Sequence, residues 1–145
     1  MKLFRNILVL AALAALPLAS QAQCRSFVKN KCQVAMLPYK FNETFNAAQL
    51  APGEEAEVDL TFFSGQDYRL IICAHPILGR VNWKLSDATG QALFTSNAEN
   101  PKDNFDFKVA TTQQLKLLIE VPAKQTGGNE MLNVGCVGIL VGFME

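Results

Sequence analysis

The stretch of sequence that decides the fold is Glu55–Phe62, EAEVDLTF, in which polar and apolar residues alternate with a period of two. Side chains of a β-strand point alternately to its two faces, so this pattern predicts a half-buried strand with an acidic face toward solvent. Turn-forming residues follow at 64–67, and the next apolar stretch, residues 68–75, ends before Pro76. Proline has no N–H for a strand ladder, so we expect the two strands to form a hairpin that ends there.

The same alternation recurs along the chain between turn-forming residues such as those at 87–90. The C-terminal stretch, residues 134–144, is instead apolar on both faces, which is typical of a strand that is covered on both sides. Three glycines within it, Gly135, Gly138 and Gly142, permit a close approach by other groups. Further strands are expected at residues 80–86, 91–96, 105–109 and 114–121, with an edge strand at 39–45.

About eight short strands separated by turns predict an all-β fold, a two-layer antiparallel β-sandwich that is jelly-roll-like. Residues 26–35 are less periodic and are expected to form a short irregular or helical N-terminal strap. Aromatic residues are expected to fill the space between the layers: Phe62, Trp83, Phe94, Phe105 and Phe107.

Two segments, QDYRL at residues 66–70 and WKLSDATGQAL at residues 83–93, resemble the central hairpins of bacterial pre-peptidase C-terminal domains and of Golgi-dynamics-type sandwich domains. Those families commonly show a strand, an Asp-x-x-Gly turn and a strand that opens with an aliphatic residue. The chain is also similar to small exported bacterial proteins of unassigned function. The resemblance implies a sandwich over about half of the mature chain. It implies no functional residue, because these families share no fixed catalytic set.

The first 22 residues predict export. Lys2 and Arg5 precede an apolar run, and Ser20, Gln21 and Ala22 place small residues before an expected cut at Gln23. The run is too short for a permanent membrane anchor. We therefore expect a signal peptide over residues 1–22, a single domain over residues 23–145 with no transmembrane segment, and a secreted or periplasmic protein. A lipid anchor on Cys24 is disfavoured because Gln23 and Gln21 suit the lipoprotein peptidase poorly.

The charge balance excludes some partners. Removing residues 1–22 takes away two of the 13 basic residues and none of the 13 acidic ones, which leaves a net charge of about −2. A nucleic-acid partner would need a basic surface, so none is expected. Half of all residues are hydrophobic, which predicts a globular chain.

Four cysteines, all beyond the signal, are expected to pair in an oxidising compartment. Sequence allows three pairings. The favoured one joins Cys73 to Cys136, on strands expected to be neighbours, and Cys24 to Cys32 in a local loop. Crossed pairings stay open. No close cysteine pair supports redox catalysis.

No catalytic or metal motif is found. His75 is the only histidine, and a zinc site would need more ligands than one histidine and paired cysteines supply. The acidic cluster is interpreted as a solvated strand face rather than a calcium site, since alternate residues lie about 6–7 Å apart along a strand. The members of this cluster are Glu54, Glu55, Glu57 and Asp59. Their expected cross-strand partners are Arg69, Lys84 or Lys116.

Aromatic side chains could also form a platform for a sugar. The candidates are Tyr39, Tyr68 and Trp83. Trp83 alternates in phase with Val81 and Leu85, which predicts that it lies in the core. Of the three, only Tyr39 is expected at the surface. We therefore expect an exported, non-enzymatic binding or accessory domain at the bacterial cell envelope, without a cofactor, whose partner is an envelope protein or a glycan. Two alternatives are a small hydrolase or metal-dependent enzyme using His75 and nearby carboxylates, and a structural protein that assembles through its C-terminal strand.

Overall fold

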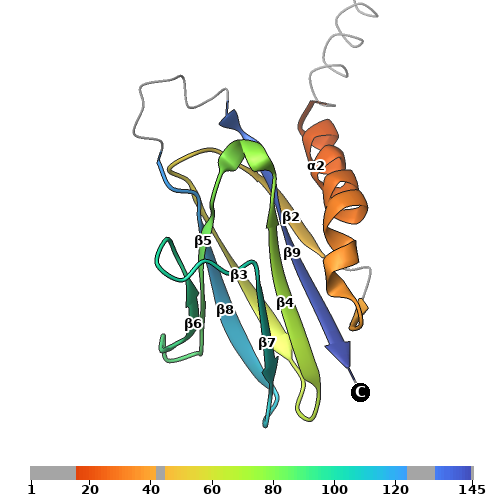
Figure 1. Cartoon of the computed structure of the whole chain (residues 1–145), viewed down its shortest axis with the longest axis vertical. Helices are drawn as coiled ribbons and strands as arrows, with labels where there is room; N and C mark the ends of the chain where they lie inside the picture. Colours follow the sequence, from red (N-terminus) through yellow and green to blue (C-terminus); the bar gives the residue numbers. More distant parts are fainter. Residues whose placement is uncertain (1–15, 42–44, 124–132, 145) are drawn as a thin grey trace, which may run out of the picture.

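The computed structural model describes residues 16–41, 45–123 and 133–144. In these parts of the chain, nine strands form two antiparallel sheets that pack face to face, as Figure 1 shows. The strands are β1 (Lys40–Phe41), β2 (Asn46–Leu50), β3 (Glu55–Phe62), β4 (Asp67–Ala74), β5 (Asn82–Ser86), β6 (Ala92–Ser96), β7 (Asn104–Lys108), β8 (Gln113–Glu120) and β9 (Gly135–Met144).

The strand order is that of a jelly roll, which confirms the predicted sandwich. Sheet A has the order β1-β9-β4-β7, with β2 also paired to β9, and sheet B has the order β3-β8-β5-β6. The predicted hairpin of β3 with β4 is wrong, because β3 pairs with β8 in sheet B and β4 pairs with β9 and β7 in sheet A. The turn after Phe62 crosses between the layers, as a jelly roll requires of consecutive strands.

The predicted edge strand at 39–45 is also different. Its first part is the two-residue strand β1, and residues 42–44 lie outside the described residues. The longer neighbour of β9 is β2, which the sequence pattern did not indicate. Its sequence, NAAQL, has small and polar residues in place of a clear alternation.

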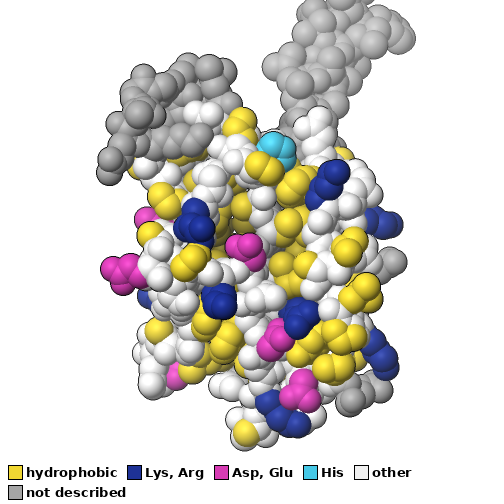
Figure 2. All heavy atoms as spheres, in the orientation of Figure 1, with side chains coloured by type: hydrophobic (Ala, Val, Ile, Leu, Met, Phe, Trp, Pro, Cys, Tyr) yellow, Lys and Arg dark blue, Asp and Glu magenta, His cyan; other side chains and the backbone are white. Residues whose placement is uncertain are grey.

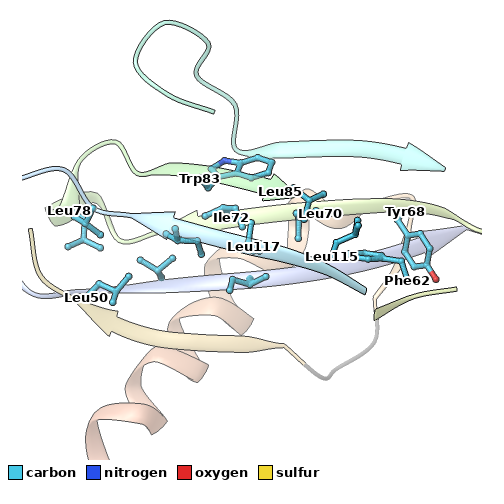
Figure 3. Packing of buried hydrophobic residues seen from close by; sticks show 14 of the residues in the cluster. Leu50, Phe62, Tyr68, Leu70, Ile72, Leu78, Trp83, Leu85, Leu115 and Leu117 are labelled. Atoms are coloured by element: carbon cyan, nitrogen blue, oxygen red, sulfur yellow. The ribbon is translucent and has the colours of Figure 1, made fainter. Parts of the chain in front are cut away.

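The core lies between the sheets, where Figure 3 shows the inward side chains of both layers meeting. Trp83 is buried there, and its indole Nε1 donates a hydrogen bond to the Lys102 carbonyl oxygen at 2.7 Å. The predicted aromatic filling is confirmed: Phe62 is fully buried, and the Trp83 ring begins a run of contacts. Ring centroids are 4.8 Å apart for Trp83–Phe94, 4.3 Å for Phe94–Phe105 and 5.2 Å for Phe105–Phe107.

A helical segment covers the outer face of sheet A. It consists of helix α2 (Leu16–Phe27), a π-helical turn (Val28–Cys32) and a 3₁₀ turn (Gln33–Met36). We call residues 16–36 the strap; Figure 1 shows it lying alongside β9. Val28 and Met36 are buried against Ile71 of β4 and Leu140 of β9. The strap and the core thus cover both faces of β9, as its apolar sequence predicts.

Glycines on β9 set how closely the strap approaches. A β-carbon at Gly138 would collide with the side chain of Val28, and one at Gly142 would collide with Met36 and Tyr39. Residue 138 is therefore restricted to glycine by the overlying strap, and residue 142 by the strap together with Tyr39. The close-approach role predicted from sequence is confirmed at these two positions and at Gly135, where a β-carbon would collide with Leu78 and Ile77.

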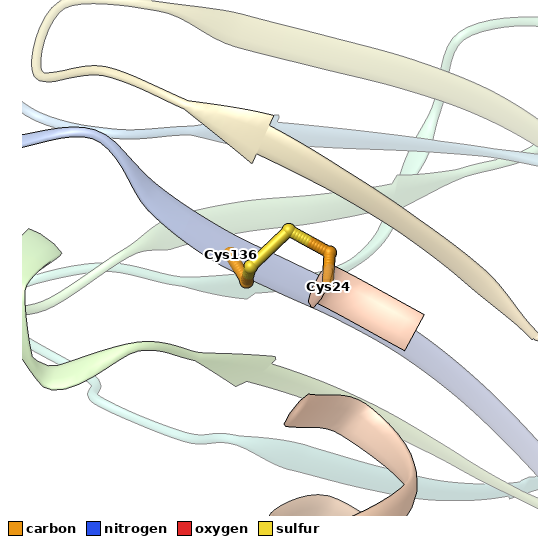
Figure 4. The surroundings of a disulfide bond; sticks show 2 residues. All are labelled: Cys24 and Cys136. Carbon is orange, nitrogen blue, oxygen red and sulfur yellow. A yellow bond between two sulfur atoms is a disulfide. The ribbon is translucent and has the colours of Figure 1, made fainter. Parts of the chain in front are cut away.

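Both disulfides join the strap to sheet A. Cys24 pairs with Cys136 of β9, as Figure 4 shows, with a Cα–Cα distance of 5.2 Å, and Cys32 pairs with Cys73 of β4 at 5.9 Å. The favoured pairing of Cys24 with Cys32 and Cys73 with Cys136 is wrong. Eight residues of helix rise about 12 Å, so Cys24 and Cys32 are too far apart to bond directly. None of the four cysteines is free.

Disulfides form and persist in oxidising compartments, so the two bonds indicate an extracytoplasmic location. Helix α2 runs through the expected cut before Gln23. The signal peptide and the domain limits at 22 and 23 stay predictions. No helix in the described ranges is both long and apolar enough to cross a membrane.

Candidate functional site

The residues that the sequence singled out do not converge on a catalytic centre. His75 directly follows β4, where its N–H donates to the Cys136 carbonyl oxygen at 2.7 Å. Its ring Nδ1 accepts a hydrogen bond from the Ile77 N–H at 3.2 Å, and the ring lies 5.4 Å from that of Phe27. His75 is therefore a strand-end residue, as expected, and its ring also caps the turn that follows.

The acidic strand is a solvated face. Glu55, Glu57 and Asp59 are exposed on β3, an edge strand of sheet B, while His75 follows a strand of sheet A. Lys116 of β8 pairs with Glu57 at 2.6 Å, which confirms one of the three expected partners. Within the described residues, no group of three His, Cys, Asp or Glu side chains could hold a metal ion. Glu54 instead accepts a hydrogen bond from the Ala51 N–H within a turn.

The three aromatic residues that the sequence suggested for a sugar platform do not form one. Trp83 and Tyr68 are buried, and the Tyr68 hydroxyl is held between the Phe63 backbone and Gln66. Tyr39 is half-buried, and the Arg69 guanidinium lies 4.5 Å from the centre of its ring. The one aromatic residue expected at the surface is thus engaged by a side chain of sheet A.

The structure does form a hollow at the edge of sheet A, which we call the β4-edge groove. Its volume is about 440 Å³, within the usual range for a ligand pocket. The strap forms one wall, the end of β4 forms the floor, and the segment leading into β5 forms the opposite wall. The lining residues used below are Lys31, Ala35, Cys73, Ala74, Arg80 and Asp103.

The groove exists because β7 does not extend along the whole of β4. The ladder between β4 and β7 ends at Ile71, opposite Asn104, and one more bond joins the Ile72 N–H to the Asp103 carbonyl oxygen at 2.8 Å. The chain before Asp103 is held on sheet B instead. There the Lys102 carbonyl oxygen accepts hydrogen bonds from Trp83 and from the Ser96 hydroxyl, at 2.7 and 2.8 Å.

This arrangement leaves the backbone of Ala74 unpaired. In an antiparallel ladder, successive residues direct their N–H and C=O groups to opposite neighbours. His75 bonds toward β9 and Ile72 bonds toward β7, so Ala74 directs both groups to the β7 side, into the groove. Neither group has a hydrogen-bond partner among the described residues. The end of β4 is thus a short free edge inside a hollow.

The groove carries an excess of positive charge. Lys31 on the strap wall and Arg80 on the opposite wall are exposed, and neither forms an ion pair with any residue that the structure describes. Asp103 is the acidic residue of the lining. In Figure 2, hydrophobic side chains are visible in the hollow of this face, with basic side chains on either side.

The strap wall of the groove is held in place at two points. The Cys32–Cys73 disulfide ties it to β4. Below that bond, Arg69 makes two hydrogen bonds to the carboxylate of Asp106, at 2.7 and 2.8 Å, and donates a third to the Leu37 carbonyl oxygen at 2.9 Å. The hydrogen bonds from Arg69 hold the pKa of Asp106 below its usual value. Partial burial, together with the Asp106 carboxylate, raises the pKa of Tyr39.

Comparisons with known proteins do not assign a function. No protein-family model matches this sequence, and no curated protein is similar to it in sequence. The resemblance to pre-peptidase C-terminal domains therefore stays a prediction. Among solved structures, PliG of Aeromonas hydrophila, a periplasmic lysozyme inhibitor of g-type lysozyme, matches with a TM-score of 0.46 and 6% identity, over 74% of this chain and 89% of PliG.

A de novo designed double-stranded β-helix matches with a TM-score of 0.33 and 16% identity, over 70% of this chain and 99% of the design. Both similarities are too distant to transfer a binding partner or a site residue. The candidate site therefore rests on the geometry of the groove itself.

Proposed function

We propose that this protein is an exported, non-enzymatic binding domain, secreted or periplasmic, that binds a protein partner at the cell envelope. The partner contributes an extended segment, which pairs with the free edge of β4 inside the groove. The observation that carries this proposal is the unpaired N–H and C=O of Ala74 at the floor of a lined hollow. Strand addition to an exposed edge is a common mode of peptide recognition.

The energetics favour a short, partly apolar segment. Each backbone hydrogen bond contributes about 0.5–1.5 kcal/mol net, so two bonds to Ala74 do not suffice for stable binding. Additional affinity comes from apolar contacts with the groove, where Ala35, Ala74 and Val81 are at least partly exposed. The disulfide and the Arg69–Asp106 pair fix the wall before binding, which reduces the ordering cost.

A protein partner is better supported than a glycan, because the aromatic residues that the sequence suggested for sugar stacking are not open. Trp83 and Tyr68 are buried, and Tyr39 lies beneath Arg69. The pairing of β9 disfavours assembly through the C-terminal strand. Within the described residues, β9 has β4 on one side and β1 and β2 on the other.

The test uses a displayed library of random twelve-residue peptides, selected on the disulfide-bonded protein, and measures the affinity of the recovered peptides for variants. Ala74→Pro removes the free N–H at an edge position, where proline is tolerated, and the loss of this hydrogen bond should weaken binding by about two- to tenfold. Ala35→Trp fills the groove from the exposed strap wall and should reduce binding equally.

Val34→Trp is the matched control, because Val34 is adjacent to Ala35, is 74% exposed and does not line the groove. It should leave the affinity unchanged. The proposal is wrong if selection yields no peptides, or if the recovered peptides bind the Ala74→Pro and Ala35→Trp variants as tightly as the original protein. Unchanged melting temperatures would show that the variants are folded.

A further inference from the structure

The two free cations of the groove lie on opposite walls. Lys31 belongs to the strap, which covers the outer face of sheet A. Arg80 precedes β5, a strand of sheet B. A segment that pairs beside β4 extends the plane of sheet A and therefore lies between these two layers.

Consecutive side chains of that segment point to opposite faces of the sheet. One residue faces the strap and Lys31, and the next residue faces sheet B and Arg80. Two adjacent residues, rather than two separated by one position, reach both cations. Asp103 also lines the groove, so the three charged side chains carry a net charge of about +1 on a mature chain of about −2.

A second hollow of the sandwich has the opposite character. It lies between β2 and β3 and has a volume of about 240 Å³. Its lining is largely apolar, and its charged residue is Glu57, which belongs to the acidic face of β3. Acidic segments are therefore disfavoured at that site and favoured at the β4-edge groove.

We infer that the segment bound in the β4-edge groove carries two adjacent acidic residues, one facing Lys31 and the next facing Arg80. This inference rests on the proposed function, since it names the partner chemistry of the same groove. Exposed charge pairs are individually weak, so each contact should change the affinity by about two- to fivefold and should weaken with salt.

The experiment uses four labelled ten-residue peptides with an otherwise identical background of alternating Thr and Val. One has an adjacent Glu pair at its centre, one has two Glu separated by one residue, one has an adjacent Gln pair and one has an adjacent Lys pair. Fluorescence anisotropy measures their binding to the disulfide-bonded protein. The adjacent Glu peptide should bind about tenfold more tightly than the Gln peptide. It should also bind more tightly than the separated Glu peptide. The Lys peptide should bind most weakly.

Charge reversal identifies the cations. Lys31→Glu and Arg80→Glu should each weaken binding of the adjacent Glu peptide by about three- to tenfold and leave the Gln peptide unaffected. Lys84→Glu is the matched control, because Lys84 is an exposed residue of β5 outside the groove and makes no ion pair with the described residues. It should change neither affinity.

The outcomes separate the two proposals. Equal binding of the Glu and Gln peptides, with both weakened in Ala74→Pro, would overturn the acidic pair and leave strand addition standing. Tighter binding of the separated Glu peptide would overturn the placement on opposite walls. Binding of the adjacent Glu peptide that is not weakened in Ala74→Pro would locate acidic binding elsewhere and overturn both proposals, as would the absence of binding by all four peptides.

Discussion

The outer faces of the two sheets differ in sequence and in structure. On sheet A, β9 presents Gly138, Leu140 and Gly142 outward, and the strap covers them. Two disulfides attach the strap to this sheet. On sheet B, the outward positions carry charge, such as the Glu57–Lys116 pair, and remain in solvent. The comparison shows that the cover on sheet A has a second consequence: it places the free end of β4 between two layers, in a groove instead of at an open edge.

The largest expected loss of stability comes from removing a disulfide of the covered face of sheet A. Cys24→Ala with Cys136→Ala removes a bond between residues 112 positions apart. Such a bond restricts the unfolded chain, so its loss should lower the free energy of unfolding by about 2–5 kcal/mol. Urea unfolding without reductant measures this value.

The open face supplies the control for the disulfide. Glu57→Gln with Lys116→Gln removes its cross-strand ion pair and should cost at most about 1 kcal/mol, because both side chains are exposed. Equal losses on the two faces would show that the strap adds nothing to stability.

A smaller effect is expected from the close approach of the strap. Gly138→Val inserts a side chain where Val28 lies, and overpacking of this kind should cost about 1–3 kcal/mol. Thr95→Val makes a change on the exposed face of β6 and should stay within about 0.5 kcal/mol. If Gly138→Val is as stable as the original protein by thermal unfolding, the strap does not rest on β9.

The smallest expected effect is on the stability of the protein at acidic pH. The folded-state pKa of Asp106 is lowered by Arg69, so the stabilisation is present above the unfolded value of about 3.9 and is lost as the pH falls through the folded value. Stability should therefore decline below about pH 4, and this decline should be shallower in Asp106→Asn. Melting temperatures between pH 3 and 7 test this, and an identical acid limb in both proteins would contradict it.

Strand positions could be predicted from sequence because alternation is a local property. Glu55–Phe62 is a strand in the structure with the predicted bounds, and the apolar β9 is covered on both faces. The partner of a strand is not a local property. Alternation in β3 and β4 fits a hairpin and a crossing between sheets equally well, and here the crossing occurs.

The disulfide pairing had a signal that strand reasoning missed. Cys24, Val28, Cys32 and Met36 recur every four residues, which is a helical spacing, and a helix would have excluded the Cys24–Cys32 bond by distance. The β4-edge groove had no comparable signal. It is made by a backbone left unpaired at Ala74, and backbone pairing depends on where distant segments end.

Hydrogen exchange at the Ala74 amide tests the central claim most directly. In the free protein, nuclear magnetic resonance should show this amide exchanging at least about 100-fold faster than that of His75, whose N–H is bonded to Cys136. Saturation with a peptide selected on the protein should slow exchange at Ala74 and shift the resonances of the residues that line the groove. An Ala74 amide that is already protected in the free protein, or a peptide that shifts β2 and β3 instead, would contradict the account.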